Sequence, residues 1–299
     1  MRNVTITFQF SMLRFLKENA LRKGAEEFHL IFKSKNPSPP ANTRAIWILS
    51  SRHGIEQQHI NCAVKSVNYK PQANASEDAV QCDVKDDYLR IKAAFEVGLK
   101  LLNKDPENVP MIIYNGLPEQ NESFRKVLKE GLSSVGLPSY PLEKIILLDL
   151  LEDEYHTPGQ FKSMVRECAS NPLLSVLNEP GVNVTIVTSA YHGPRTRRLF
   201  NSQKVPTPLP YANISFHLID RAFGRDCIRR DLEGELNRIE GYLALGDIGE
   251  PRSLEWFASP AAWTPLREYS ACTQNIIKKY DLIVGKKTNR SALTLKPAN

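Results

Sequence analysis

The sequence lacks any run of apolar residues long enough to cross a bilayer. A membrane-spanning helix needs about 20 consecutive apolar residues, and no segment of the 299-residue chain comes near that length. Residues 1–24 interrupt their apolar positions with Gln9, Arg14 and Lys17, so they do not form the continuous core of a signal peptide. These absences predict a cytoplasmic protein without a membrane span. They are also what an effector secreted by a dedicated export machinery would show.

Cysteine is scarce and shows no pairing pattern. The five cysteines are odd in number, lie far apart and include no CxxC pair, which argues against a disulfide framework and against a structural zinc site. We expect free thiols with no metal bound through them, at Cys62, Cys82, Cys168, Cys227 and Cys272.

Several signatures of well-known chemistry are absent as well. The chain contains no GxGxxG, GxxxxGK[ST], GxSxG or HExxH, which argues against the standard dinucleotide fingerprint, P-loop chemistry, the hydrolase nucleophile elbow and one class of zinc protease. The formal net charge is +6, yet Lys and Arg are spread along the chain and form no basic stripe. We therefore expect a small anionic ligand and no nucleic acid as partner.

What the sequence does contain is an alternation of strand and helix patterns. Nearly continuous apolar runs are typical of strands that are buried on both faces of a parallel sheet, and they occur at residues 45–49, 110–114, 144–148, 182–187 and 214–219. Apolar residues at helical spacing lie between them, over residues 86–103, 123–135 and 158–177. This alternation predicts an α/β fold with one doubly wound parallel sheet.

Both ends of the chain extend beyond this pattern. Residues 1–42 contain a possible helix (Met12 to Phe32) and the linker-like string KNPSPPAN, and residues 249–299 follow a helical pattern that stops at Gly246. We expect these ends to form helical extensions around a main domain over residues 43–248. Residues 52–84 are too many for an ordinary loop between a strand and a helix, so they are an insertion or a lid.

In an open parallel sheet, ligands bind beyond the carboxyl ends of the strands, near the switch in strand order. Polar residues follow directly on several of the predicted strands. Because they converge on one edge, they are the candidate ligand contacts: Ser50, Ser51, Arg52, His53, Asn115, Gly116, Asp220 and Arg221.

The most distinctive string is VTIVTSAYHGPRTRRLF, residues 184–200. A buried strand runs into Thr188, Ser189 and His192, and Pro194 suits the first turn of a helix. The helix start, together with His192 and Arg195, would receive an anion, and we expect Arg195 to be largely solvated until that anion binds. The alternatives are a capped helix start with solvated arginines, or a Ser189 nucleophile with His192 as base, for which the sequence names no orienting acid.

A second polar string, DLLEDEYHTPGQ, covers residues 149–160. Thr157 as N-cap and Gln160 three residues later predict a capping box for a helix that begins at Pro158. The acidic residues and the imidazole before it are either metal ligands and a general base or a solvated face: Asp149, Glu152, Asp153, Glu154 and His156.

The string TSAYHGPRTRRLF resembles the motif of the YdcF-like family, which includes the SanA and ElyC proteins. The order of the other pieces is similar: AIWILS, an Arg90-bearing helix, MIIYNG followed by Asn121 or Glu122, IILLD, HTPGQ and GELNRIEGYLALGDI, over roughly residues 44–248. The chain departs from the family at Ser50-Ser51, where a glycine is usual, at Asn115-Gly116, which replaces a serine with two glycines, and at Gln160, where Asn is common.

This resemblance implies a Rossmann-like sheet in the order 3-2-1-4-5, with a polar pocket over the strand ends. It implies a nucleotide or S-adenosylmethionine as ligand, whereas the reaction of the family is poorly defined. The positions that match the family's motif are Thr188, Ser189, His192 and Arg195, together with Thr157 and Gln160.

Three functions remain open at this point. In the first, the chain is an enzyme of small anionic, nucleotide-like metabolites, in which Arg195 neutralises charge and His192 donates or accepts a proton. In the second, the same pocket binds a nucleotide or S-adenosylmethionine without catalysis. The third is a metal-assisted phosphohydrolase that uses Asp149, Glu152 or His156.

Overall fold

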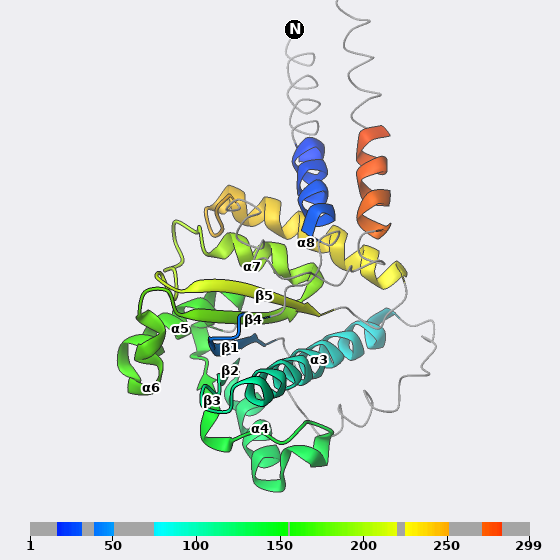
Figure 1. The fold of residues 1–299 in the computed structure, drawn as a ribbon. Coiled ribbons are helices and arrows are strands. Elements are labelled where there is room, and N and C mark those ends of the chain that lie inside the picture. Colours follow the sequence, from blue (N-terminus) through cyan, green and yellow to red (C-terminus); the bar gives the residue numbers. More distant parts are fainter. Residues whose placement is uncertain are drawn as a thin grey trace, which may run out of the picture.

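The computed structural model describes residues 17–31, 39–50, 75–154, 156–219, 225–250 and 271–282. Within these residues the centre of the fold is a five-stranded sheet in the order β3-β2-β1-β4-β5 (Figure 1). All its neighbouring strands are parallel. The strands are β1 (Thr43–Leu49), β2 (Met111–Gly116), β3 (Ile145–Asp149), β4 (Asn183–Ser189) and β5 (Asn213–Ile219). The predicted doubly wound α/β fold and its strand order are confirmed.

The strands are buried on both faces, which is why their sequences read as continuous apolar runs. Side chains of a strand alternate between the two faces, so Trp47 and Leu49 of β1 belong to one hydrophobic cluster and Ile46 and Ile48 to the other. All four side chains are fully buried. The central strand therefore ties together two separate apolar cores.

Helices cover each face of the sheet. The helices α3 (Ala75–Lys104) and α4 (Pro118–Glu130) pack on the face of Ile46 through apolar residues such as Phe95 and Phe124. The other face is covered by α5, α7 and α8, and the helices over residues 17–31 and 271–282 contribute apolar side chains to the same hydrophobic cluster. The remaining bounds are α5 (Thr157–Ser170), α6 (Pro172–Ser175), α7 (Gly193–Leu199) and α8 (Arg225–Leu245), with short 3₁₀ helices at Leu132–Val135, Leu142–Lys144, Glu152–Glu154, Val176–Asn178 and Ala190–His192.

Part of the predicted insertion is helical. The helix α3 begins at Ala75, so residues 75–84 extend the helix that the apolar spacing indicates only from residue 86. Residues 51–74, which include Ser51, Arg52 and His53, lie outside the described residues, as do Asp220 and Arg221.

The two terminal helices lie side by side next to α8 (Figure 1). Arg22 contacts Asp281 at 3.5 Å, while His29 contacts Thr273 at 3.4 Å. Because the contacts run in opposite directions along the two segments, the helices are antiparallel. Apolar side chains of both helices join the core on the α5 face of the sheet: Leu21, Ala25, Phe28, Ile31, Cys272, Ile276 and Tyr280.

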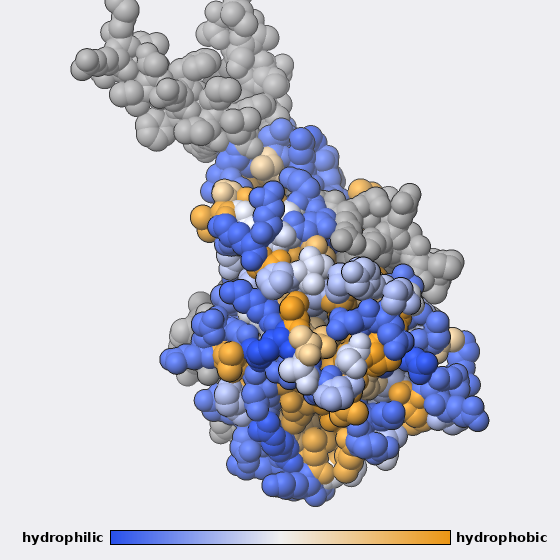
Figure 2. Space-filling view, turned by 90° about the vertical axis from the view of Figure 1, so that its left-hand side faces the viewer, coloured by the Kyte–Doolittle hydropathy of each residue, from blue (hydrophilic) through white to orange (hydrophobic). Residues whose placement is uncertain are grey.

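The face of the molecule that Figure 2 draws is mostly polar. Figure 2 shows hydrophilic side chains over most of one face, with apolar ones gathered in its lower middle. None of the helices within the described residues is both long enough and apolar enough to span a bilayer. Cys168 and Cys272 are both buried, as expected for packed thiols.

Candidate ligand site at the carboxyl edge of the sheet

Polar side chains gather at the carboxyl edge of the sheet. The chain order reverses between β1 and β4, because β2 lies on one side of β1 and β4 on the other. Such a switch point is where open α/β sheets bind ligands. The polar residues buried at this edge are Ser50, Arg90, Asn115, Gln160, Thr188, Ser189 and His192.

Three of the predicted ligand contacts instead tie the strands together. The backbone N–H of Ser50 donates to Gln160 Oε1 at 3.1 Å, and Gln160 Nε2 donates to the Ser50 carbonyl at 3.1 Å. Asn115 Oδ1 accepts from the Trp47 indole at 2.8 Å. Buried polar groups need such partners. Ser50, Asn115 and Gln160 therefore support the site by fixing the positions of β1, β2 and α5 relative to one another.

Gly116 is closely packed. A Cβ atom at this position would lie 2.5 Å from a ring carbon of Tyr114 and 2.6 Å from Asn121 Oδ1, distances that side chains do not tolerate. The Asn121 amide donates to Asp149 at 2.6 Å. Glycine is therefore required here so that α4 can approach the end of β2.

The acidic residues after β3 point to separate partners. Asp149 accepts from Arg125 Nη2 at 2.9 Å, whereas buried Glu154 pairs with Arg166 and accepts from the Leu151 N–H at 2.9 Å. Glu152 and Asp153 are exposed. Across the described parts of the chain, no three His, Cys, Asp or Glu residues form a cluster that could hold a metal ion, so the structure does not bring the predicted metal ligands together.

The predicted Thr157 cap is wrong. The helix α5 begins at Thr157, and His156 is its N-cap residue, with Nδ1 accepting from the Gly159 N–H at 2.9 Å. The imidazole nitrogen thus takes the role that a hydroxyl usually has. Thr157 is free of that role because its hydroxyl turns toward His192, and Gln160 does not complete a capping box because it binds Ser50.

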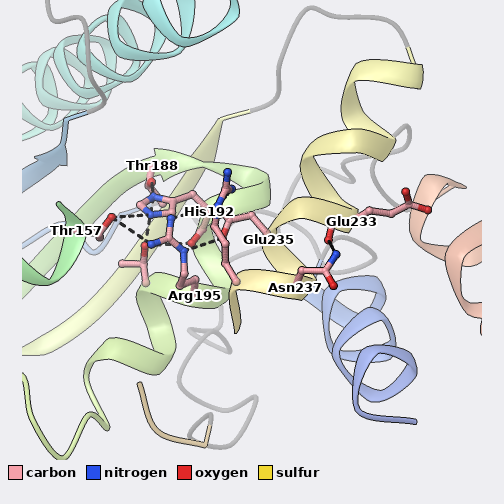
Figure 3. A network of polar contacts seen from close by, with 9 residues as sticks. Thr157, Thr188, His192, Arg195, Glu233, Glu235 and Asn237 are labelled. Carbon is pink, nitrogen blue, oxygen red and sulfur yellow. Dashed lines mark hydrogen bonds and ion pairs between the residues drawn. The ribbon is translucent and has the colours of Figure 1, made fainter. Parts of the chain in front are cut away.

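Both ring nitrogens of His192 contact threonine hydroxyls (Figure 3). Nδ1 lies 2.9 Å from Thr188 Oγ1, and Nε2 lies 3.2 Å from Thr157 Oγ1. His192 is buried, and burial holds its pKa well below the usual range, with the charges of Arg195, Arg90 and Arg238 acting in the same direction. The imidazole is therefore neutral at neutral pH.

Arg195 is not solvated, contrary to the prediction. Its Nε and Nη2 donate to the two carboxylate oxygens of Glu235 at 2.7 and 3.2 Å, and its Nη1 donates to Thr157 Oγ1 at 3.4 Å. The guanidinium also lies 5.7 Å from the ring centroid of Tyr242. The reason is tertiary, because α8 packs over α7 and brings Glu235 to this position.

Glu235 was missed as a site residue, although the sequence holds a signal for it. It stands three residues after Leu232 and four before Ile239, on the stripe by which α8 packs onto the core. The Glu235 side chain is only 1% exposed. A charged residue on an apolar stripe needs a buried partner, and the partners are Arg195 and Arg238.

Ser189 is engaged by an arginine. Arg90 from α3 donates from Nε to the Ser189 hydroxyl at 2.9 Å and from Nη1 to the Leu49 carbonyl at 2.7 Å. Arg90 thus bridges the ends of β1 and β4 across the switch point. The hydroxyls within hydrogen-bond distance of the His192 ring are those of threonines, so the contact that the alternative of a Ser189 nucleophile requires is not formed.

The other two arginines of α7 face the N-terminal helix. Arg198 Nη2 donates to Glu27 at 2.6 Å and Arg197 Nη1 to the same carboxylate at 3.4 Å. Both arginines are buried, and burial lowers the pKa of Arg197. The alternative of solvated arginines is therefore also wrong, because the terminal helix covers them.

Comparison of the chain with protein-family models, with curated proteins and with solved structures finds no significant match. The resemblance to the YdcF-like family therefore stays a prediction based on the quoted motifs.

Proposed function

We propose that this chain is a YdcF-like, Rossmann-like enzyme that binds a small anionic metabolite at the carboxyl ends of β1 and β4. The expected ligand is nucleotide-like, with S-adenosylmethionine as the other candidate. One observation carries the proposal. Arg90 and Arg195 reach this edge from different helices, and they donate to the hydroxyls of Ser189 and Thr157.

The electrostatics of the edge favour an anion. Burial is the largest cause of the lowered pKa of His192, and the charges of Arg195, Arg90 and Arg238 lower this pKa further. The positive charges of these three arginines favour a negative charge near the imidazole. Guanidinium groups suit phosphate and carboxylate because their planar fork donates two parallel hydrogen bonds.

The contact between His192 Nε2 and the Thr157 hydroxyl favours catalysis over binding alone. A neutral imidazole can accept a proton, and a contact from Nε2 to a hydroxyl is the geometry that general base catalysis requires. The runner-up function is a binding protein that holds the same metabolite without turnover. The metal-assisted phosphohydrolase has weaker support because its candidate ligands Asp149 and Glu154 are each paired with an arginine.

Calorimetric titration of the full chain tests the proposal. The probes are inorganic phosphate, AMP and S-adenosylmethionine, with adenosine as the uncharged comparison for AMP. We expect AMP to bind more tightly than adenosine, and Arg90→Gln to weaken AMP binding by about tenfold, which corresponds to about 1.4 kcal/mol. The matched control is Arg125→Gln, since Arg125 is 40% exposed and pairs with Asp149 at the β3 end of the same edge.

The outcomes separate the three functions. The proposal is contradicted if AMP and adenosine bind with equal affinity, or if no anion binds. Both results come from the unaltered chain, so they do not depend on whether a variant folds. Binding without turnover identifies a non-catalytic binding protein. Turnover that a chelator abolishes identifies a metal-assisted enzyme.

A further inference from the structure

Among the described residues, four hydroxyl side chains lie next to Arg90, Arg195 or His192, and one of these four residues is partly exposed. Thr188, Ser189 and Thr196 are fully buried, whereas Thr157 is partly exposed. Figure 3 shows Thr157 facing both His192 and Arg195. Of these four residues, Thr157 is therefore the one that a ligand arriving at the edge can contact.

The contacts of Thr157 give its hydroxyl a preferred direction. A guanidinium only donates hydrogen bonds, so Thr157 Oγ1 accepts from Arg195 Nη1 at 3.4 Å. The hydroxyl proton is then available to His192 Nε2, 3.2 Å away. In this arrangement the ring proton lies on Nδ1 and is donated to Thr188 Oγ1 at 2.9 Å.

This chain of contacts has the parts of an activated nucleophile. Such sites need a nucleophile in contact with a base, and a third group that orients the base. Thr157 is the nucleophile in this arrangement, His192 the base and Thr188 the group that orients the base. The Thr196 hydroxyl donates to the His192 carbonyl at 3.1 Å and so helps to fix the position of His192. Arg195 adds a positive charge beside the oxygen on which negative charge would develop.

We infer that Thr157 is the nucleophile of this site and His192 its general base, in phosphoryl transfer from a phosphate monoester. The inference rests on the proposed function, because it requires that an anion bind at this edge. It names the reactive residue, which is Thr157 and not Ser189, and the substrate class.

The reaction consists of two balanced steps. Thr157 Oγ1 forms a bond to the phosphorus, its proton passes to His192 Nε2, and the bond from phosphorus to the ester oxygen breaks as that oxygen takes the proton from His192. The products are an alcohol and a phosphothreonine. Water then attacks the phosphorus, its proton passes through His192 to Thr157 Oγ1, and inorganic phosphate leaves.

The charges around His192 make its ability to accept a proton depend on whether the substrate is bound. The groups that face it are Arg195 on α7, Arg90 on α3 and Arg238 on α8, with Glu235 bound to Arg195 and Arg238. Burial disfavours a proton on the imidazole most, and the charges of the three arginines act in the same direction. A bound phosphate offsets the positive charges, so the same substrate that supplies the phosphorus also favours proton transfer to His192.

The experiment uses the full chain with p-nitrophenyl phosphate as substrate and inorganic phosphate as the binding probe. Nitrophenol release measures the first step, and peptide mass analysis after acid quenching locates the phosphate. The variants are Thr157→Val, which keeps shape but removes the hydroxyl, Thr157→Ser, which restores it, and His192→Gln. The matched control is Thr207→Val, which removes a hydroxyl that binds the Phe200 carbonyl at 3.2 Å.

We expect the unaltered chain to release nitrophenol and to carry phosphate on Thr157. Thr157→Val and His192→Gln should each lose at least about a hundredfold in turnover, as expected when a nucleophile or a general base is removed. Thr157→Val should still bind inorganic phosphate, Thr157→Ser should retain measurable turnover, and Thr207→Val should resemble the unaltered chain.

Two kinds of failure are distinguishable. If the unaltered chain binds phosphate but releases no nitrophenol, or if Thr157→Val keeps its turnover, or if the phosphate lies on Ser189, the assignment of Thr157 is overturned while the proposed anion site stands. If the unaltered chain binds no phosphate and no nucleotide, the proposed function itself fails.

Discussion

Arg195 and Glu235 form a two-contact ion pair between residues 40 positions apart in the sequence, with side chains 11% and 1% exposed. The pair joins α7, which begins directly after the site histidine, to α8, which follows the last strand of the sheet. Arg195 thus has two roles, because the same guanidinium also donates to Thr157. Its position in the site is therefore set by α8.

The first prediction concerns this ion pair. We expect Glu235→Gln to lower the free energy of unfolding by about 3 kcal/mol, because it leaves the largely buried Arg195 without its counter-charge. The control is Glu233→Gln on the same helix, where the partner is Lys279 and the two side chains are 32% and 55% exposed. That change should cost less than about 1 kcal/mol. Urea denaturation measures both, and equal losses would contradict a buried pair.

The second prediction concerns the tie between α5 and the first strand. Gln160→Leu should lower the free energy of unfolding by about 2 to 3 kcal/mol, because the buried N–H and carbonyl of Ser50 both lose their partner. Lys162→Leu, at an exposed position of the same helix, should change it by no more than about 0.5 kcal/mol. A neutral Gln160→Leu would show that Ser50 finds other partners and that Gln160 does not support the site.

The third prediction separates the cap from the site at the start of α5. His156→Ala should cost about 1 kcal/mol of stability and should increase amide hydrogen exchange at Gly159, because the Gly159 N–H donates to the His156 ring. Thr157→Val should leave exchange at Gly159 unchanged, since the Thr157 hydroxyl faces His192. Exchange that rises in Thr157→Val and not in His156→Ala would return the capping role to Thr157.

The fourth prediction is a loss of stability in mild acid. Burial, with a contribution from Lys100, lowers the pKa of His217 on β5 to about 4. Between this value and the pKa of about 6.5 in the unfolded chain, the unfolded state binds more protons. The stabilising contribution of neutral His217 is therefore complete above about pH 6.5 and is lost as the pH falls toward 4, by up to about 3 kcal/mol.

The check is the free energy of unfolding as a function of pH for the unaltered chain and for His217→Gln. The difference between the two curves removes the effect of carboxylate titration, which both share. It should narrow as the pH falls from 6.5 to 4, and a constant difference over this range would contradict the lowered pKa. His192, whose pKa is also lowered, adds to the loss in the same direction in both proteins.

The strands could be predicted because each is buried on both faces. The apolar runs at residues 45–49 and 182–187 correspond to β1 and β4, although the strands extend to residues 43–49 and 183–189. Their ends were missed because polar residues such as Thr188 and Ser189 continue the β4 ladder. The hydrogen bonds between parallel strands are made by backbone groups. A strand can therefore continue past the point where its apolar side chains end.

The candidate site was only half predictable. The string that ends β4 correctly indicated that Thr188, Ser189 and His192 lie at the carboxyl edge, because a strand followed by a helix start places them there. The partners were predicted less well. The sequence predicted Thr157 as the cap of its own helix and Arg195 as a solvated side chain, and it offered Ser189 with His192 only as an alternative, since local rules describe contacts between near neighbours in the chain.

The order of the residues was enough to predict the sheet. Apolar runs, polar strand ends and helical spacing are local patterns, and each indicates its strand or helix without knowledge of the rest of the fold. Only the tertiary structure decided which polar groups meet. Glu235 reaches Arg195, Arg90 reaches Ser189, and Glu27 reaches Arg198, and each pairing depends on how one helix packs over another. A buried charge pairs with the group that packing brings within hydrogen-bond distance. Which group this is cannot be predicted from local sequence patterns.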